Sequence, residues 1–317
     1  MIPDPDLEPA AIRAAHDRLP AAFRDSPQYV HEGLSSTLGV PVILKVETVN
    51  PIRSFKGRGT WTVSQALAAE GRIGPTRPVV CVSAGNFGQG VAYGARALGV
   101  PSVVFCSTRA NRGKVARMRA LGAEVIEHGE DFDTARGASE AYAAEHEAEL
   151  LVDGDDVRIS TGAATLALEL TDAVERGDLP MPAIIAVPVG NGALLNGVGS
   201  WLRAVVPSCR VLGVQAAEAD AMSRSWRAGR PVDTASADTY ADGIASRIAI
   251  PSAVELMHGR VDEMLTVSEA ELHDAQAVLT EATGITVEGA AAASWAGLVR
   301  GPRPDGPAVV IVTGSNA

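Results

Sequence analysis

The chain carries the stretch Asn50-Pro51-Ile52-Arg53-Ser54-Phe55-Lys56-Gly57-Arg58-Gly59, which connects a predicted strand to a predicted helix. The apolar run 40–46 precedes it, and residues 60–70 follow it with apolar side chains at helical spacing. Lys56 therefore stands where a loop becomes a helix. The positive end of the helix dipole disfavours an ammonium group there, and a neutral amine is a nucleophile that forms Schiff bases with carbonyl groups. The alternative is a solvated surface lysine near a helix start, and the loop alone leaves both interpretations open.

The composition is that of an ordinary globular protein long enough for two domains. The chain has 317 residues, of which 46% are hydrophobic and 21% charged. Its net charge of −11 makes nucleic acid an unsuitable partner. An acidic balance also keeps a protein soluble, and that is its default explanation here.

The cysteines and the N-terminal segment indicate a reduced compartment. Cys81, Cys106 and Cys209 form no CxxC pair, and the six histidines show no spacing typical of a metal site. Residues 1–8 have neither a basic region nor an apolar core, so they do not resemble a signal peptide. Because no apolar run approaches the roughly 20 residues needed to cross a bilayer, we expect a soluble cytoplasmic protein with no membrane partner.

Strands and helices alternate along most of the chain, which predicts βαβ units and a parallel sheet. In the first block, strands at 79–82, 102–106, 124–126 and 150–152 alternate with helices at 88–98, 113–121 and 131–147. In the second block, strands at 183–189, 210–215, 261–267 and 307–312 alternate with helices at 161–175, 193–205, 269–283 and 287–299. Residues 218–245 are polar and expected to be irregular. Residues 50–153 are expected to form a small domain.

Three predicted strand ends open into glycine-rich turns, at 83–90, 189–194 and 313–316. Ligands of open α/β sheets bind beyond the carboxyl ends of the strands, and backbone N–H groups at a helix start bind anions. Glycine can also serve only to make a tight turn, so each turn taken alone leaves its function open.

Five motifs occur together in this chain: PIRSFKGRG at 51–59, SAGNFGQG at 83–90, PVGNGALLNG at 188–197, TYADGIA at 239–245 and TGSN at 313–316. In order and spacing they resemble the fold type II enzymes that depend on pyridoxal 5'-phosphate, and most of all the threonine and serine dehydratases of the tryptophan synthase beta-like superfamily. The resemblance implies a two-domain α/β fold in which each domain is a twisted, mostly parallel sheet flanked by helices. Residues 1–49 and 154–317 would form the large, cofactor-binding domain and residues 50–153 the small one. It also implies a homodimer.

The resemblance assigns roles to individual residues. Lys56 would hold the cofactor as a Schiff base and then remove the α-proton of the substrate, so it is the expected catalytic residue. Phe55 would pack on the cofactor ring, Asn86 would donate to its phenolic oxygen and Thr313 would pair with its pyridine nitrogen. The residues expected to hold the phosphate are Gly190, Asn191, Gly192, Ala193 and Leu194, and those expected to contact the substrate are Ser83, Ala84, Gly85, Asn86, Arg53 and Asp242.

Thr313 as the partner of the pyridine nitrogen bears on the reaction. A hydroxyl group does not force that nitrogen to be protonated, so the ring withdraws electrons more weakly than it would beside a carboxylate. We therefore expect β-elimination or β-replacement rather than transamination.

Several positions depart from the pattern of the dehydratases. Ala84 stands where racemases carry a serine base, which argues against racemase activity. Gln215 and Ala221 stand where related enzymes have acidic metal ligands, so no metal site is expected; Glu218 and Asp220 nearby read as a solvated loop. Phe87, Asn191 and Arg53 also differ from the usual residues and leave the substrate open. Arg53 could bind an anionic group or face solvent, and Glu288 could influence the cofactor or only stabilise a helix start.

The leading expectation is a lyase, a threonine/serine ammonia-lyase that converts L-threonine or L-serine to a 2-oxo acid and ammonia. The alternative is a β- or γ-replacement synthase, similar to cysteine synthase or threonine synthase, acting on an activated or phosphorylated amino acid. A binding protein without cofactor and a nucleotide-binding Rossmann enzyme are further possibilities; the intact lysine disfavours the first and the lack of a GxGxxG motif the second.

Overall fold

The computed structural model describes residues 3–130 and 132–316, in which the strands form two separate sheets. The larger sheet has the order β1-β2-β10-β7-β8-β9, with β1 antiparallel to β2 and all other neighbours parallel. Its strands are β1 (Gln28–Val30), β2 (Val42–Val46), β10 (Ala308–Val312), β7 (Ile184–Pro188), β8 (Arg210–Ala216) and β9 (Glu263–Val267). The smaller, fully parallel sheet has the order β5-β4-β3-β6, from β5 (Glu124–Glu127), β4 (Ser102–Cys106), β3 (Val79–Val82) and β6 (Glu149–Leu151). The predicted α/β class with two mostly parallel sheets is confirmed.

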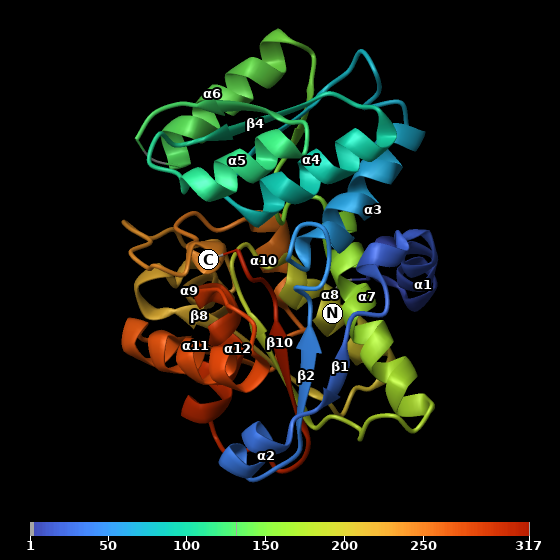
Figure 1. Ribbon diagram of the computed structural model, residues 1–317, viewed down its shortest axis with the longest axis vertical. Helices are drawn as coiled ribbons and strands as arrows, with labels where there is room; N and C mark the ends of the chain where they lie inside the picture. The colour runs from blue at the N-terminus through green and yellow to red at the C-terminus, as the bar shows by residue number, and fades with distance from the viewer. Residues whose placement is uncertain (1–2, 131, 317) are drawn as a thin grey trace.

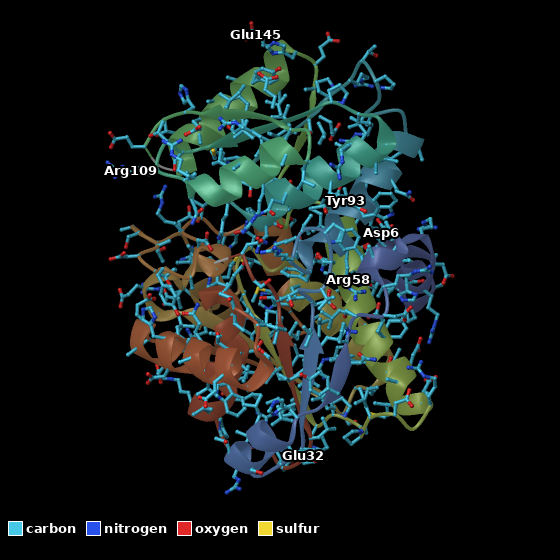
Figure 2. The ribbon with its side chains drawn as sticks, viewed as in Figure 1. Asp6, Glu32, Arg58, Tyr93, Arg109 and Glu145 are labelled. Atoms are coloured by element: carbon cyan, nitrogen blue, oxygen red, sulfur yellow. The ribbon has the colours of Figure 1, made fainter. Side chains whose placement is uncertain are left out.

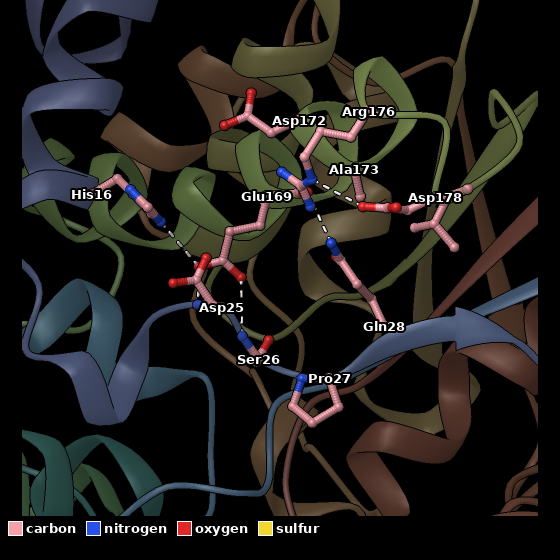
Figure 3. A pocket seen from close by; sticks show the side chains of 11 residues that line it. His16, Asp25, Ser26, Pro27, Gln28, Glu169, Asp172, Ala173, Arg176 and Asp178 are labelled. Carbon is pink, nitrogen blue, oxygen red and sulfur yellow. Dashed lines mark hydrogen bonds and ion pairs between the residues drawn. The ribbon is translucent and has the colours of Figure 1, made fainter.

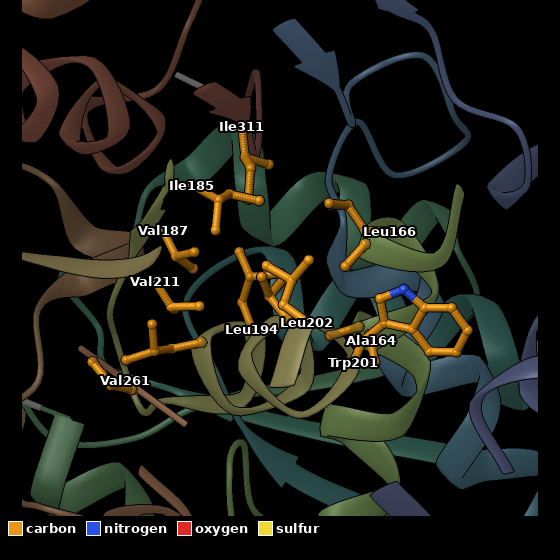
Figure 4. Packing of buried hydrophobic residues seen from close by; sticks show 14 of the residues in the cluster. Ala164, Leu166, Ile185, Val187, Leu194, Trp201, Leu202, Val211, Val261 and Ile311 are labelled. Carbon is orange, nitrogen blue, oxygen red and sulfur yellow. The ribbon is translucent and has the colours of Figure 1, made fainter. Parts of the chain in front are cut away.

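The larger sheet is buried on both faces. Neighbouring residues of one strand point to opposite faces, so in β7 Ile185 packs into one hydrophobic cluster while Ile184 packs into another. Helices α7 (Val157–Glu175) and α8 (Ala193–Val205) cover the first face, where Ile185, Leu194 and Ile311 lie together (Figure 4). Helices α11 (Glu269–Thr283) and α12 (Gly289–Arg300) cover the second. The remaining helices around this sheet are α1 (Pro9–Arg18), α2 (Glu32–Leu38), α9 (Ala221–Ala228) and α10 (Pro251–Met257).

The smaller sheet lies above the larger one along the long axis of the molecule (Figure 1). Helices α3 (Lys56–Ala69), α4 (Asn86–Leu98) and α5 (Arg112–Ala120) share one hydrophobic cluster with Cys81 and Val104. Helix α6 (Phe132–Glu145) covers the opposite face, against Val80 and Phe105. All four strands of this sheet fall inside the segment 50–153 that the sequence proposes as the small domain.

A buried ionic cluster fixes α3 against α7 and β2. The Arg58 guanidinium donates to Glu47 and Glu169, with its Nη1 2.7 Å from Glu169 Oε1, and the Lys45 ammonium also contacts Glu169. Arg58 is fully buried, and Figure 2 labels it near the centre of the view. Burial by itself would raise the pKa of Glu169, but the charges of Arg58 and Lys45 outweigh it and hold that pKa well below 4.5. These four charges are compensated within the cluster, as buried charges must be.

The structure differs from the sequence-based predictions at several elements. Helix α3 begins at Lys56 instead of residue 60, and α9 lies inside the 218–245 segment that was expected to be irregular. That expectation was wrong for residues 221–228 because Met222 packs into the core of the larger sheet and Gly229, in a left-handed conformation, ends the helix. The short elements β1 and α2 were not predicted. The predicted helix over 131–147 starts at residue 131, which lies outside the described residues.

No helix within residues 3–130 and 132–316 combines the length and the apolar character needed to cross a bilayer.

Candidate active site

A cavity of about 430 Å³ lies between the two sheets, where strands from both of them end. Residues one or two positions beyond the ends of β3, β6, β7 and β10 line it, among them Ser83, Asp153, Gly190 and Thr313. The carboxyl ends of parallel strands are where α/β proteins bind their ligands. Four segments far apart in the sequence therefore meet at one site.

Lys56 is the first residue of α3, and its side chain points into this cavity. Its Nζ lies 2.9 Å and 2.7 Å from the two carboxylate oxygens of Asp153. The rings of Phe55 and Phe87 flank the same nitrogen, with centroids 5.0 Å and 5.8 Å away. The Phe55 N–H donates to the Thr313 carbonyl at 3.0 Å, which fastens the start of α3 to the end of β10.

A hydrogen-bonded network holds Asn86 at the wall of the cavity. The Asn86 Nδ2 donates to both carboxylate oxygens of Glu288, at 3.1 Å and 2.9 Å, and its Oδ1 accepts from Asn316 Nδ2 at 2.8 Å. Asn316 is fully buried, and its backbone N–H also donates to Glu288. Burial raises the pKa of Glu288, whereas the Lys114 ammonium and the hydrogen bonds from Asn316 and Asn86 lower it; burial prevails.

The turn 190–194 forms a cradle at the start of α8. Gly192 has a φ of +93° and caps α8 without a side-chain hydrogen bond, so the backbone N–H groups of the first turn remain for an anion. A Cβ on Gly190 would lie 2.7 Å from the Gly243 carbonyl oxygen, so only glycine fits there. The Asn191 side chain faces the protein: its Nδ2 donates to the Asp153 carbonyl at 3.0 Å and its Oδ1 accepts from Ser246 Oγ at 2.7 Å.

The residues expected to contact substrate divide into two groups. Ser83, Ala84, Gly85, Asn86 and Asp242 line the cavity. Arg53 is not among the lining residues: it is exposed, has a φ of +51°, and its carbonyl accepts a hydrogen bond from the Ser315 N–H at 3.0 Å. The structure does not bring Arg53 to the other predicted site residues.

Several residues at this site were not predicted from the sequence, among them Asp153, Lys114 and Asn316. The Lys114 ammonium, from α5, forms an ion pair with the Asp242 carboxylate across the cavity. Asp153 comes directly after the predicted strand 150–152. A carboxylate at the carboxyl end of a strand could therefore have indicated a site residue from the sequence alone. Asn316 lies inside the TGSN motif, but the resemblance assigned it no function.

The expected absence of a metal stays a prediction. At the position considered, the Gln215 Oε1 accepts from the Ser223 N–H at 2.9 Å, and Asp220 pairs with Arg224. Elsewhere in the described chain, His16, Asp25 and Glu169 could reach one ion at the edge of a second hollow (Figure 3). The Glu169 carboxylate already forms ion pairs with Arg58 and Lys45. We therefore assign His16, Asp25 and Glu169 to the buried ionic cluster and not to a metal site.

Comparison with known proteins places this cavity in context. The family model described as "Pyridoxal-phosphate dependent enzyme" matches residues 21–314. The L-threonine ammonia-lyase of Geobacter sulfurreducens is 33% identical over 307 residues, which cover 96% of this chain and 74% of that protein. The phenylserine dehydratase of Ralstonia pickettii is 32% identical over 297 residues, 94% of this chain and 88% of that protein. The crystal structure of a threonine deaminase from T.th. superposes with a TM-score of 0.89 at 32% identity and covers 99% of both chains.

Proposed function

The chain belongs to the family of pyridoxal-phosphate-dependent enzymes, and from that premise we propose that it is an ammonia-lyase acting on L-threonine or L-serine. The observation that carries the proposal is the position of Lys56, whose amine lies in a cavity closed by the glycine turn 190–194 and by Thr313. The similarity to a threonine ammonia-lyase, over 96% of this chain and 74% of that protein, supports the same function.

The cavity has suitable groups for each part of pyridoxal phosphate. The N–H groups at the start of α8 would hold the phosphate. The turn 190–194 packs so closely against Gly243 that only glycine fits at position 190. Phe55 would pack on the ring, and the buried Thr313 would pair with the pyridine nitrogen. When bound, the cofactor links to amino groups through its aldehyde and draws electrons from the α-carbon of an amino acid.

The residues of the chain then supply the proton chemistry. The turn 83–86 at the start of α4 would orient the α-carboxylate of the amino acid through its N–H groups. The Lys56 amine would take the proton from the α-carbon, and the β-hydroxyl group would leave with a proton as water. Water then enters again as the amino group is released, so L-threonine gives 2-oxobutanoate and ammonia and L-serine gives pyruvate and ammonia.

A second candidate, the replacement synthase, is favoured by one observation. Besides Lys56, three basic residues line the cavity, namely Lys114, Arg136 and Arg247. An activated amino acid with a phosphate or another anionic substituent would find partners there.

The two functions are separated by one assay. We expect the purified protein with pyridoxal phosphate to release 2-oxo acid from L-threonine or L-serine. The ammonia-lyase proposal fails if neither amino acid releases a 2-oxo acid while O-phospho-L-serine, O-phospho-L-homoserine or O-acetyl-L-serine with sulfide is consumed.

Three further proposals follow from the resemblance. We propose a large cofactor-binding domain over 1–49 and 154–317 with a small domain over 50–153, a homodimer, and a cytoplasmic location. Light scattering of the purified protein tests the oligomeric state, since a mass near 32.7 kDa would exclude a dimer.

A further inference from the structure

Asp153 is the polar partner that the described residues offer to the Lys56 amine. Both carboxylate oxygens lie within 3 Å of Nζ. The other close groups are the Phe55 and Phe87 rings, which supply no carboxylate or carbonyl acceptor. The two side chains are 14% and 18% exposed, so water screens the pair only in part.

The backbone of Asp153 is held by Asn191, which is itself fixed by Ser246. Asn191, in the glycine turn, donates its Nδ2 to the Asp153 carbonyl, and Ser246 donates its hydroxyl to Asn191 Oδ1. The next residue, Gly154, has a φ of +91°, and a Cβ there would lie 2.7 Å from the Asn191 carbonyl oxygen. The asparagine that interrupts the glycine turn thus positions the carboxylate that faces the lysine.

From this geometry we propose that Asp153 is the positioning residue of Lys56, held in place by Asn191. The proposal rests on the function proposed above, in which the lysine amine must separate from the cofactor while an amino acid is bound. A free lysine amine lies at the end of a flexible four-carbon side chain and can turn away from the substrate. The Asp153 carboxylate holds that amine inside the cavity and stabilises the positive charge that it gains when it takes the α-proton.

The test compares four cofactor-loaded proteins: wild type, Asp153→Ala, Asp153→Asn and Asp155→Asn. Asp155 is a matched control, because it is exposed, lies two positions away and contacts Ser252 instead of Lys56. The first measurement is deuterium incorporation at Cα of L-alanine in D₂O, followed by NMR. L-Alanine has no β-leaving group, so its exchange reports the proton transfer without elimination.

We expect Asp153→Ala to lower the exchange rate at saturating L-alanine about 100-fold and Asp153→Asn about 10-fold, typical of losing a group that assists proton transfer. The half-saturating concentration should change less than about threefold, because the carboxylate acts through the lysine and not on the amino acid. Asp155→Asn should match wild type. Thermal unfolding of each variant shows whether it is folded.

The second measurement is the absorbance spectrum of the bound cofactor at neutral pH, which a merely structural residue would leave unchanged. We expect Asp153→Asn to shift it, since the carboxylate beside the Lys56 nitrogen is lost, and Asp155→Asn to leave it as in wild type. Unchanged exchange in Asp153→Ala overturns the inference. A change in the half-saturating concentration alone also overturns it, because that would mean that Asp153 binds the amino acid directly.

These readouts keep the two proposals apart. If wild type exchanges the α-proton of L-alanine but releases no 2-oxo acid from L-threonine or L-serine, the proposed function is wrong. The exchange rates of the variants still test the role of Asp153 in that case. If wild type exchanges too slowly to measure, the spectrum decides, and an unshifted spectrum in Asp153→Asn overturns the role of Asp153.

Discussion

At Glu288, burial and hydrogen bonding shift the pKa in opposite directions. Burial raises its pKa above the ordinary 4.5, although Lys114, Asn316 and Asn86 pull it down. A carboxyl group whose pKa is higher in the folded than in the unfolded protein contributes stability below the unfolded pKa and loses it as pH rises through the folded pKa. We therefore predict that the free energy of unfolding of wild type, relative to Glu288→Gln, falls as pH rises above about 4.5 and then levels off.

Urea unfolding of both proteins at a series of pH values from acid to neutral measures this difference. Glu281→Gln serves as the control, because Glu281 is exposed on α11 and does not line the cavity. A stability of wild type that increases relative to Glu288→Gln over the same range would mean that the hydrogen bonds from Asn86 and Asn316 dominate instead.

Residue by residue, the sequence predicts what is local and misses what is distant. Lys56 and the glycine turns stand next to their strands, so hydrophobic pattern and turn chemistry are enough to find them. The partner of Lys56 is 97 positions away, and no local pattern connects the two. The position of Arg53 was equally hidden, because whether a loop side chain enters a cavity depends on how the loop packs against β10 and the chain beyond it.

Helices α3, α7 and α8 pack so closely that their contact surfaces admit no side chain at certain positions. A Cβ on Gly162 of α7 would lie 2.4 Å from the Arg58 carbonyl oxygen of α3, and one on Gly197 of α8 would lie 2.2 Å from the Ser160 carbonyl oxygen of α7. Such distances require the helices to move apart. The periodicity of the sequence predicts that these helices exist, but the closeness of their approach is a property of the packed structure.

We predict that Gly162→Ala lowers the free energy of unfolding by about 1–3 kcal/mol or more, the usual cost of overfilling a packed contact. Gly137→Ala is the matched control on α6, where glycine is exposed and an added Cβ meets nothing within 4 Å. That change should stabilise the protein by about 0.5–1 kcal/mol, because alanine favours a helix over glycine. Urea unfolding measures both, and two variants of equal stability would show that α3 and α7 separate easily.

At the scale of the molecule, α5 connects the two sheets across the mouth of the cavity. Its Lys114 forms an ion pair with Asp242, which lies in the turn before α10, and its Arg117 Nη1 donates to Asn316 Oδ1 at 2.7 Å. Lys114 is nearly buried, whereas the Asp242 side chain is 51% exposed, so dissolved salt can reach and screen the pair. The alternation of strands and helices predicts the two sheets, but it contains no information on this contact between them.

We predict that Asp242→Asn raises KM for the amino acid about threefold to fivefold with a smaller change in kcat, since a half-exposed ion pair contributes at most about 1 kcal/mol. Asp242→Lys should have a larger effect, because it sets two cations against each other. Asp238→Asn, a change at a residue outside the cavity, should match wild type. Added salt should raise the wild-type KM toward that of Asp242→Asn and leave the KM of the variant nearly unchanged.

Hydrogen exchange of the α5 amides reports the contact without turnover. The exchange should be faster in both Asp242 variants than in wild type. Unaltered exchange together with unaltered KM would mean that α5 is held by Arg117 and Asn316 alone.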